Sequence, residues 1–288
     1  MKGSYSRLTT YSCKRRGYYQ YVRKIEPINA SELAPVYGAA IHKGLRVLFD
    51  LFAKGEREIA INEGVKAFQK AFDPIIEDPK GLRTVESGRQ IIQAFHDQWL
   101  TRYPWEDIAG EKELTMAFEN GDEFVAILDR LGKMMGVPTI LEFKTTAWPH
   151  YFTIDPNFQV MGQSAVAQAN GFEGFLDIQF ILIHLHENAK NGWIVPKKKG
   201  VEPSSIFRLL PVTLTPAKLS EWERDAMALM EQIKECERNN YWPKETEHCR
   251  DFGGCPYRQL CVTSDPEEIE LMIQTAYKTI QGREEELE

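Results

Sequence analysis

The stretch TILEFKTT, residues 139–146, sets two charged side chains into an otherwise apolar segment. Its β-branched and aromatic residues, with Pro138 at the entry, predict a strand. Alternate residues of a strand point to the same face, so Glu142 and Lys144 project side by side. An isolated pair of this kind is ordinarily an ion pair on a solvated strand, but burying it in an apolar strand is costly without a purpose. The pair is therefore a candidate functional site.

A second carboxylate lies a short turn upstream, in the predicted strand EFVAILDRLG, residues 123–132. If the two strands pair as a hairpin, Asp129 reaches the same place as Glu142 and Lys144. Two hard oxygen ligands suit Mg²⁺ or Mn²⁺, which retain waters and bind few carboxylates together with a substrate phosphate. A lysine beside such an ion can orient or deprotonate an attacking water and offset charge at phosphorus. The constellation favours metal-assisted chemistry on a phosphate group.

The rest of the chain alternates between helical and strand patterns. Apolar residues recur at helical spacing through Ile41, Leu45 and Leu48, which predicts a helix over residues 34–55. The remaining predicted elements are helices at about 4–24, 61–76, 84–102, 157–171 and 216–237, and strands at 137–148, 175–187 and 205–215. This order predicts an α/β or α+β core wrapped by helical additions. We expect a single domain over residues 1–264, with its two ends forming a lobe together, and an acidic tail over 265–288.

Charge is distributed unevenly along the 288 residues, whose formal net charge is −7. The last 24 residues contain eight Asp or Glu and two Lys or Arg, whereas the first 25 contain seven Lys or Arg, no acid and five tyrosines. Basic side chains can neutralise phosphates while aromatic rings stack on bases or fill a core. The negative net charge therefore does not exclude a nucleic-acid partner. No apolar run is long enough to span a bilayer, and the start of the chain lacks a signal-peptide core, so we expect a cytoplasmic protein without a membrane partner.

The order of these motifs resembles the PD-(D/E)XK nuclease superfamily, specifically its RecB-like exonuclease branch. The segment LDR followed by ILEFKTT is similar to the family's aspartate and (D/E)-x-K core. The segment YGAAIHKGL places His42 where the family has a metal-binding histidine on an early helix. The segment FQVMGQSAVA supplies Gln159 for the family's glutamine, but Gln163 stands where the family usually has tyrosine. Glu113 in GEKELTMAF is similar to a glutamate on the family's preceding strand.

The resemblance implies a restriction-endonuclease-like fold, in which helices flank a central mixed sheet. It implies Mg²⁺ or Mn²⁺ as the cofactor and Lys144 as the catalytic lysine, with Gln159 orienting the substrate or that lysine. The implied metal ligands are His42, Asp129, Glu142 and the backbone carbonyl of Phe143. The role of Gln163 stays open. Candidate DNA contacts are Lys14, Arg15, Arg16 and Gln163.

Three cysteines near the end of the chain, Cys249, Cys255 and Cys261, are separated by five residues each. Five cysteines in all form a poor basis for a disulfide framework, and clustered thiols in a reducing compartment more often bind a metal. Neither Zn²⁺ nor an iron–sulfur cluster is normally closed by three protein ligands. The candidates for the fourth are Cys13, Cys236 and His248.

RecB-like nucleases with an iron–sulfur cluster, such as the AddB subunit and the CRISPR adaptation nucleases, place one cysteine before the nuclease core and three after it. The arrangement of Cys13, Cys249, Cys255 and Cys261 is similar, although the first two C-terminal cysteines of those relatives are usually closer together. The resemblance implies a structural [4Fe–4S] cluster on these four residues, with structural Zn²⁺ as the alternative. Either would tie the two ends of the chain together.

The function that the sequence favours is a metal-dependent DNA exonuclease in DNA recombination, repair or processing of DNA ends. DNA as the substrate and digestion from an end both rest on the resemblance. The chain lacks a phosphate-binding motor motif, so a helicase, a recombinase or another DNA-processing protein is expected as a separate partner. Two alternatives remain open: a catalytically idle nuclease-fold module that binds DNA or a helicase, and a metal-stapled scaffold without a nucleic-acid role. Digestion polarity, strand preference and oligomeric state leave no signature in the sequence.

Overall fold

The computed structural model describes residues 1–29, 33–72, 78, 80–148, 157–185, 194–195, 204–250 and 254–280. The chain divides into two compact units, which are named here by their content. The terminal unit comprises Met1–Ser31, Ala117–Val125 and Glu221–Glu288, and the sheet unit comprises Glu32–Met116 and Ala126–Ser220. Within the described part of the chain, no helix has both the length and the apolarity needed to cross a membrane.

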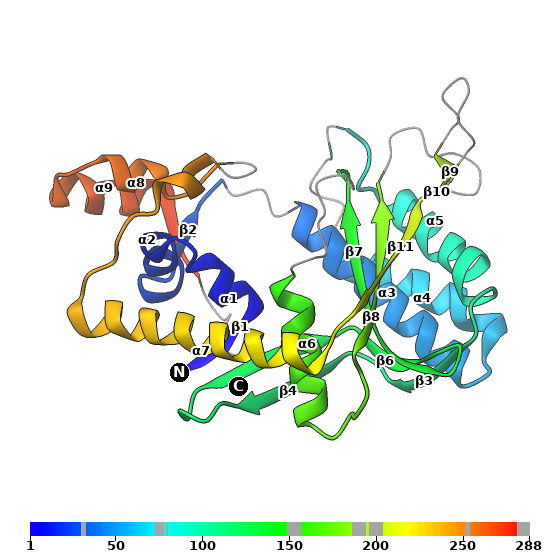
Figure 1. Cartoon of the computed structure of the whole chain (residues 1–288). Helices are drawn as coiled ribbons and strands as arrows, with labels where there is room; N and C mark the ends of the chain where they lie inside the picture. Colours follow the sequence, from blue (N-terminus) through cyan, green and yellow to red (C-terminus); the bar gives the residue numbers. More distant parts are fainter. Residues whose placement is uncertain are drawn as a thin grey trace. The chain divides into compact units, whose positions relative to one another are not determined.

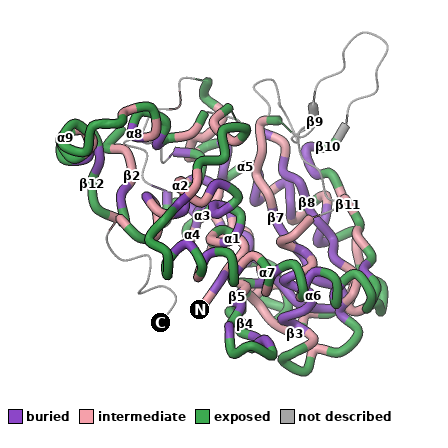
Figure 2. Tube along the Cα trace, turned by 60° about the vertical axis from the view of Figure 1, so that its left-hand side comes forward, coloured by how far each residue is buried: buried purple, intermediate pink, exposed green. Residues whose placement is uncertain are grey.

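A five-stranded mixed sheet forms the centre of the sheet unit, in the order β11-β8-β7-β6-β3 (Figure 1). Its strands are β3 (Trp105–Ala109), β6 (Arg130–Met134), β7 (Val137–Thr146), β8 (Asp177–His184) and β11 (Phe207–Thr213). Strands β7 and β8 run parallel, while the other neighbours are antiparallel. Both faces of a parallel pair are normally covered, which explains the unbroken buried runs at 139–143 in β7 and 178–183 in β8 (Figure 2).

The predicted strand over residues 123–132 is two strands that separate at Asp129, β5 (Glu123–Leu128) and β6, and they belong to different sheets. Only β6 forms the expected hairpin with β7, with Arg130 opposite Leu141 and Met134 opposite Val137. The connecting residues, Met135 and Gly136, both have positive φ, of 54° and 84°. Two-residue turns of this handedness match the twist of paired strands. The turn therefore fixes the register that brings Asp129, the residue before β6, beside β7.

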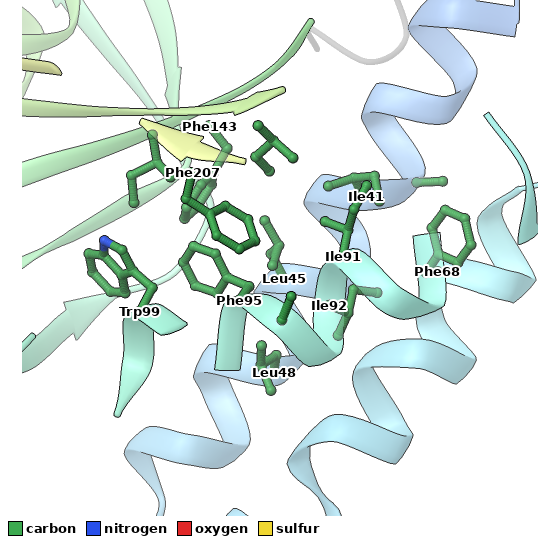
Figure 3. Close-up of a cluster of buried hydrophobic side chains, with 14 of the residues drawn as sticks. Ile41, Leu45, Leu48, Phe68, Ile91, Ile92, Phe95, Trp99, Phe143 and Phe207 are labelled. Carbon is green, nitrogen blue, oxygen red and sulfur yellow. The ribbon is translucent and has the colours of Figure 1, made fainter. Parts of the chain in front are cut away.

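Helices α3 (Leu33–Ala53), α4 (Arg57–Ala71) and α5 (Val85–Phe95) lie against one face of this sheet. Figure 3 shows how Phe143 of β7 and Phe207 of β11 meet Phe95 of α5 beside Leu45 and Leu48 of α3. The ring of Phe143 lies edge-on to Phe95, with centroids 5.6 Å apart. Since successive strand residues point to opposite faces, Glu142 and Lys144 face away from these helices.

The opposite face carries helix α6 (Phe158–Ala169), which connects β7 to β8. Its first turn is capped by Asn157, whose side-chain oxygen accepts hydrogen bonds from the backbone N–H groups of Gln159 and Val160. The helix ends before Gly171, as predicted, where φ is +83°. The polar side chains of its early turns can therefore meet the polar face of β7.

The terminal unit brings together segments from both ends of the chain. Strand β1 (Lys2–Ser4) pairs with β5 (Glu123–Leu128), and β2 (Ile25–Pro27) pairs with β12 (Tyr277–Thr279). The hydroxyl of Tyr257 donates to the carbonyl of Ile25 at 2.7 Å inside a small aromatic core. The other elements of this unit or leading into it are α1 (Tyr5–Thr10), α2 (Lys14–Gly17), the π-helical turn η1 (Tyr18–Val22), α7 (Pro216–Asn239), the 3₁₀ turn η4 (Thr246–Arg250), α8 (Arg258–Val262) and α9 (Pro266–Ala276).

Most predicted elements are present, with differences at their ends. The predicted N-terminal helix is three short helical pieces, α1, α2 and η1, and its first cap is Ser4. The predicted helix at 84–102 is α5 followed by a π-helical turn, η2 (His96–Leu100). The sequence did not predict β3. It predicted β4 (Lys112–Ala117) only because Glu113 resembles a glutamate on a strand of the family. The short strands β9 (Ile194–Val195) and β10 (Ser204–Ser205) complete the described elements.

Candidate active site

Strand β7 supplies the centre of the site. Glu142 is 2% exposed, and the ammonium of the half-buried Lys144 lies 2.6 Å from its Oε1 atom. The two residues share a face of β7, as their spacing predicts. A buried carboxylate of this kind is stable only when partners compensate its lost hydration, and the neighbouring segments provide those partners.

Asp129 joins the site from the start of β6. Its Oδ2 atom accepts a hydrogen bond from the backbone N–H of Phe143 at 2.8 Å, which attaches the carboxylate to β7. Its Oδ1 atom lies 3.0 Å from Nδ1 of His42, which comes from α3. The imidazole packs edge-on to the Phe143 ring, with centroids 6.0 Å apart. Helix α3 and the β6–β7 hairpin therefore converge on one pair of side chains.

Helix α6 contributes two glutamines four residues apart, so both lie on one face of the helix. Gln159 donates from Nε2 to Oε1 of Glu142 at 2.7 Å. Gln163 donates from Nε2 to Oε2 of the same carboxylate at 2.6 Å, and Nε2 also lies 3.4 Å from the carbonyl oxygen of Ile127. Both oxygens of Glu142 are thus hydrogen-bonded by side chains that the sequence places in one helix.

The two carboxylates differ in their electrostatic environment. Burial alone raises the pKa of Asp129, but the charge and hydrogen bond of His42 and the N–H of Phe143 outweigh it and lower the pKa. Burial and the Asp129 charge together hold the pKa of Glu142 above its usual range, despite the opposing effect of Lys144. Neighbouring acids whose pKa values are pushed apart are characteristic of functional sites.

His42 responds to the same charges. Burial lowers its pKa, but the charge and hydrogen bond of Asp129, followed by the charge of Glu142, more than offset burial, so the pKa is raised. Its side chain keeps 32% of its surface exposed. Protonated His42 and Lys144 can therefore balance the two carboxylates in the protein without a cation.

The donor set at this site fits a hard divalent cation. Among the described residues, no three His, Cys, Asp or Glu side chains are already arranged to hold an ion. At Glu142, Lys144 and the two glutamines take up the carboxylate oxygens. Two carboxylates and an imidazole are nevertheless the ligand types that Mg²⁺ and Mn²⁺ accept. The backbone carbonyl of Phe143 stays a predicted ligand beside them.

The predicted cysteine group lies in the terminal unit. Cys13 precedes α2, Cys249 is in η4, and Cys261 is in α8. Burial chiefly raises the thiol pKa of Cys255, and nearby Cys249 and Cys13 raise it further; burial, Cys255 and Cys13 act likewise on Cys261. All four are free thiols, and each of the other three interacts electrostatically with Cys255.

The other two candidates for a fourth ligand are placed differently. Cys236 is buried in α7, and the groups acting on its pKa, after burial, are headed by Lys14 and Glu235 and include no second thiol. His248 directly precedes Cys249 in η4. Cys13 stays the predicted partner of the C-terminal trio.

The basic run Lys14–Arg16 lies next to the segment that leads to the C-terminal cysteines. Arg15 donates from Nε to the carbonyl of Trp242 at 2.8 Å, and its backbone N–H donates to the carbonyl of Pro243 at 3.0 Å. The charges of Arg15 and Arg16 oppose the raised pKa values of Cys261 and Cys255, respectively. The DNA contacts predicted for this run stay a prediction.

Sequence reasoning missed one residue that supports the site. Arg130 is 1% exposed and forms a double hydrogen bond to Asp107 of β3, at 2.6 and 2.8 Å. Its guanidinium also lies 2.7 Å from Asp50 of α3 and over the ring of Phe49. The signal was present, because an arginine beside Asp129 in a strand points to the opposite face and toward α3.

A family model described as "PD-(D/E)XK nuclease superfamily" matches residues 2–262. The crystal structure of a candidate exonuclease from Eubacterium rectale is similar to this chain, with 16% sequence identity, a TM-score of 0.51, and coverage of 95% of this chain and 92% of that one. An alkaline exonuclease from Laribacter hongkongensis matches with 15% identity over 64% of this chain and 84% of its own, at a TM-score of only 0.29. No curated protein matches the chain.

Proposed function

The chain belongs to the PD-(D/E)XK nuclease superfamily, and on that premise we propose that it is a Mg²⁺- or Mn²⁺-dependent deoxyribonuclease that digests DNA from its ends. The observation that carries the proposal is the convergence of Asp129, Glu142 and Lys144, which are joined through the Phe143 backbone and a 2.6 Å ion pair. Glu142 in this group is buried and hydrogen-bonded at both oxygens, whereas an ordinary ion pair on a strand surface is solvated. The group therefore differs from a simple surface ion pair.

Each side chain has a separate task in this proposal. Asp129, Glu142, His42 and the carbonyl of Phe143 would hold the cation, which would supply Lewis-acid chemistry for the phosphodiester and the attacking water. Lys144, which approaches Glu142 from the more exposed side, assists the attacking water and offsets negative charge at phosphorus. Gln159 orients Glu142 and, through it, the partner lysine.

The four-cysteine group supports a second proposal, a structural [4Fe–4S] cluster on Cys13, Cys249, Cys255 and Cys261. These thiols fit such a group because they lie in one unit and because Cys13, Cys249 and Cys261 each interact electrostatically with Cys255. Lys244 and Arg15 near Cys261 would offset the charge of bound thiolates. Structural Zn²⁺ is the alternative. Iron and acid-labile sulfide in anaerobically purified protein support the cluster, while a colourless protein with stoichiometric zinc contradicts it.

DNA is the proposed partner, with a helicase, a recombinase or another DNA-processing protein as a further one. The proposed biological role is DNA recombination, repair or processing of DNA ends. Lys14, Arg15 and Arg16 are the candidate DNA contacts. Gln163, also predicted as one, is only 2% exposed and its amide meets Glu142 instead. A contribution of the basic run to phosphate binding predicts affinity that falls steeply as salt rises.

The proposed activity is tested with DNA labelled at either end. Linear and circular substrates, single- and double-stranded, are incubated with Mn²⁺ and sampled over time. Mononucleotide or short-oligonucleotide release from linear DNA, with circles left intact, is the expected result. Cleavage of circles indicates an endonuclease instead. DNA binding without cleavage under several divalent cations indicates the catalytically idle module, and absence of both contradicts any nucleic-acid role.

A further inference from the structure

Gln163 occupies an unusual position for a residue that departs from the family pattern. It is 2% exposed in α6, and its Nε2 atom lies 2.6 Å from Oε2 of Glu142. The same nitrogen lies 3.4 Å from the carbonyl oxygen of Ile127, two residues before Asp129. Its amide therefore bridges the two chain segments that carry the carboxylates.

The two oxygens of Glu142 are held in different ways. Oε1 is shared by Gln159, at 2.7 Å, and by Lys144, whose side chain is 34% exposed. Oε2 is held by Gln163 from within the protein. Contacts at both oxygens fix the plane of a carboxylate, so Gln163 restricts rotation that Gln159 and Lys144 alone would permit.

The other end of the Gln163 amide is an unmatched acceptor. Its Oε1 atom is buried and has no hydrogen-bond partner within the described part of the chain. A buried polar atom without a partner is costly and calls for an explanation. The contact that the other end of the amide makes with Glu142 supplies one.

Resting on the proposed function, we propose that Gln163 is the positioning residue for Glu142: its Nε2 holds Oε2 of the carboxylate in the orientation in which Glu142 would bind the cation. A side chain that orients a metal-binding carboxylate raises metal affinity without touching the ion. This role does not require the tyrosine that the family usually has, since an amide supplies the donor.

Mn²⁺ binding without DNA tests the inference directly. Isothermal titration calorimetry is performed on the wild type, on Gln163→Met, which keeps the side-chain length without polar atoms, and on Gln168→Met as the matched control. Gln168 lies on the same helix, and its amide is 3.5 Å from Ser164 instead of reaching Glu142. Gln163→Met should raise the Mn²⁺ dissociation constant roughly 10–100-fold, while Gln168→Met should leave it unchanged.

Thermal unfolding of the same proteins separates positioning from folding. Gln163→Met removes the unmatched Oε1 but leaves Oε2 of Glu142 without its donor, so its midpoint should fall modestly below that of Gln168→Met. Metal affinity is compared at a temperature where both proteins are fully folded. If Gln163→Met does not fold, Gln163→Asn replaces it, since the shorter amide cannot reach Glu142 and should show the same loss of affinity.

The outcomes are distinct. Unchanged Mn²⁺ affinity in a folded Gln163 variant contradicts the inference and leaves the proposed function intact. Absence of Mn²⁺ binding in the wild type contradicts both. Selective loss of affinity in the Gln163 variants supports the inference whatever DNA the enzyme digests.

Discussion

Single residues of the site act mainly through Glu142. Its carboxylate is buried, its pKa is raised by burial and by Asp129, and it is surrounded by Lys144, Gln159 and Gln163. A carboxylate in this position binds a cation readily, because the positive charge offsets both the cost of burying the ionised carboxylate and its repulsion from Asp129. Asp129, which is already paired with His42, contributes a carboxylate that stays ionised.

The titration of His42 is the first prediction. In the metal-free protein, the pKa of His42 should lie above its ordinary value of about 6.5, because Asp129 outweighs burial. In Asp129→Asn the pKa should fall, since burial remains while the carboxylate charge is lost. NMR titration of the imidazole protons measures both values. A wild-type pKa at or below the ordinary value contradicts the prediction.

The same pairing makes the stability of the metal-free protein depend on pH. Because the folded-state pKa of His42 is raised, its contribution is fully present below the ordinary pKa and disappears as pH rises through the raised value. The difference in unfolding free energy between wild type and His42→Asn should therefore shrink with increasing pH. Urea unfolding at several pH values measures it, and a difference that grows with pH has the wrong sign.

The sequence predicted His42, Asp129, Glu142, Lys144 and Gln159, and the structure brings them together. Strand alternation places Glu142 and Lys144 on one face, and the family pattern orders the others. Neither argument defined the role of Gln163, because its hydrogen bond depends on how α6 lies over β7. The four-residue spacing between Gln159 and Gln163 does predict that both lie on one face of a helix. That this face meets Glu142 follows only from the position of α6.

At the scale of elements, a buried arginine connects three parts of the sheet unit. Arg130 of β6 bonds Asp107 of β3 and Asp50 of α3, and it lies against the ring of Phe49. Since Arg130 directly follows Asp129 and Asp50 shares a helix with His42, this connection helps hold the Asp129–His42 pair. A strand and a helix that are distant in sequence are thus aligned at the site.

Removing this connection is the second prediction. Arg130→Met should lower the free energy of unfolding by about 3 kcal/mol, because Asp107 would lose its partner in a partly buried place. Lys133→Met is the matched control on the same strand. The Lys133 side chain is 39% exposed and lies 3.2 Å from the more exposed Glu106, so its loss should cost less than about 1 kcal/mol. Equal unfolding free energies for the two variants in urea contradict the assignment.

Close packing of α4 and α5 gives the third prediction. A methyl group at Gly88 of α5 would overlap the ring of Phe68 in α4, a fully buried side chain. Gly88→Ala should therefore destabilise the protein by roughly 1–3 kcal/mol, although alanine favours helices. Gly38→Ala in α3 is the control, since its added carbon would meet only Thr145 Oγ1, at 3.3 Å. Thermal unfolding compares them, and a stabilised Gly88→Ala contradicts the packing.

Long elements with a clear period were predictable, and short ones were not. The helix α3 and the strands β7 and β8 have apolar residues at regular spacing over many positions. Strand β3 alternates half-buried and exposed residues over only five positions, so its sequence resembles a loop. The break between α1 and α2 likewise depends on tertiary packing around Tyr11 and Cys13, both buried.

At the scale of the whole molecule, the two ends of the chain share one unit. Strands β2 and β12 pair, and Arg23 forms a double hydrogen bond with Glu270 at 2.8 and 2.9 Å. The sequence predicted this union through the cysteines alone. The strand pairing could not be predicted, because strands of three residues carry too little pattern.

Iron content gives the fourth prediction. Cys13→Ser should lose most bound iron and sulfide, since it removes the ligand that joins the N-terminal segment to the C-terminal trio. Cys236→Ser is the control, because it removes a buried thiol of α7 that is not one of the four proposed ligands. Iron and sulfide analysis of anaerobically purified proteins, with visible absorption spectra, measures the difference. Full iron content in Cys13→Ser contradicts the proposed ligand set.

The central claim is that Lys144 beside Glu142 takes part in hydrolysing DNA. The most direct measurement is the rate of acid-soluble nucleotide release from linear DNA with Mn²⁺, for wild type, Lys144→Met and the control Lys133→Met. A general acid–base or charge-stabilising group contributes about 10²–10⁴-fold to a rate. The account predicts a loss of that size for Lys144→Met alone, with its fold retained. Wild-type rates in folded Lys144→Met would contradict it.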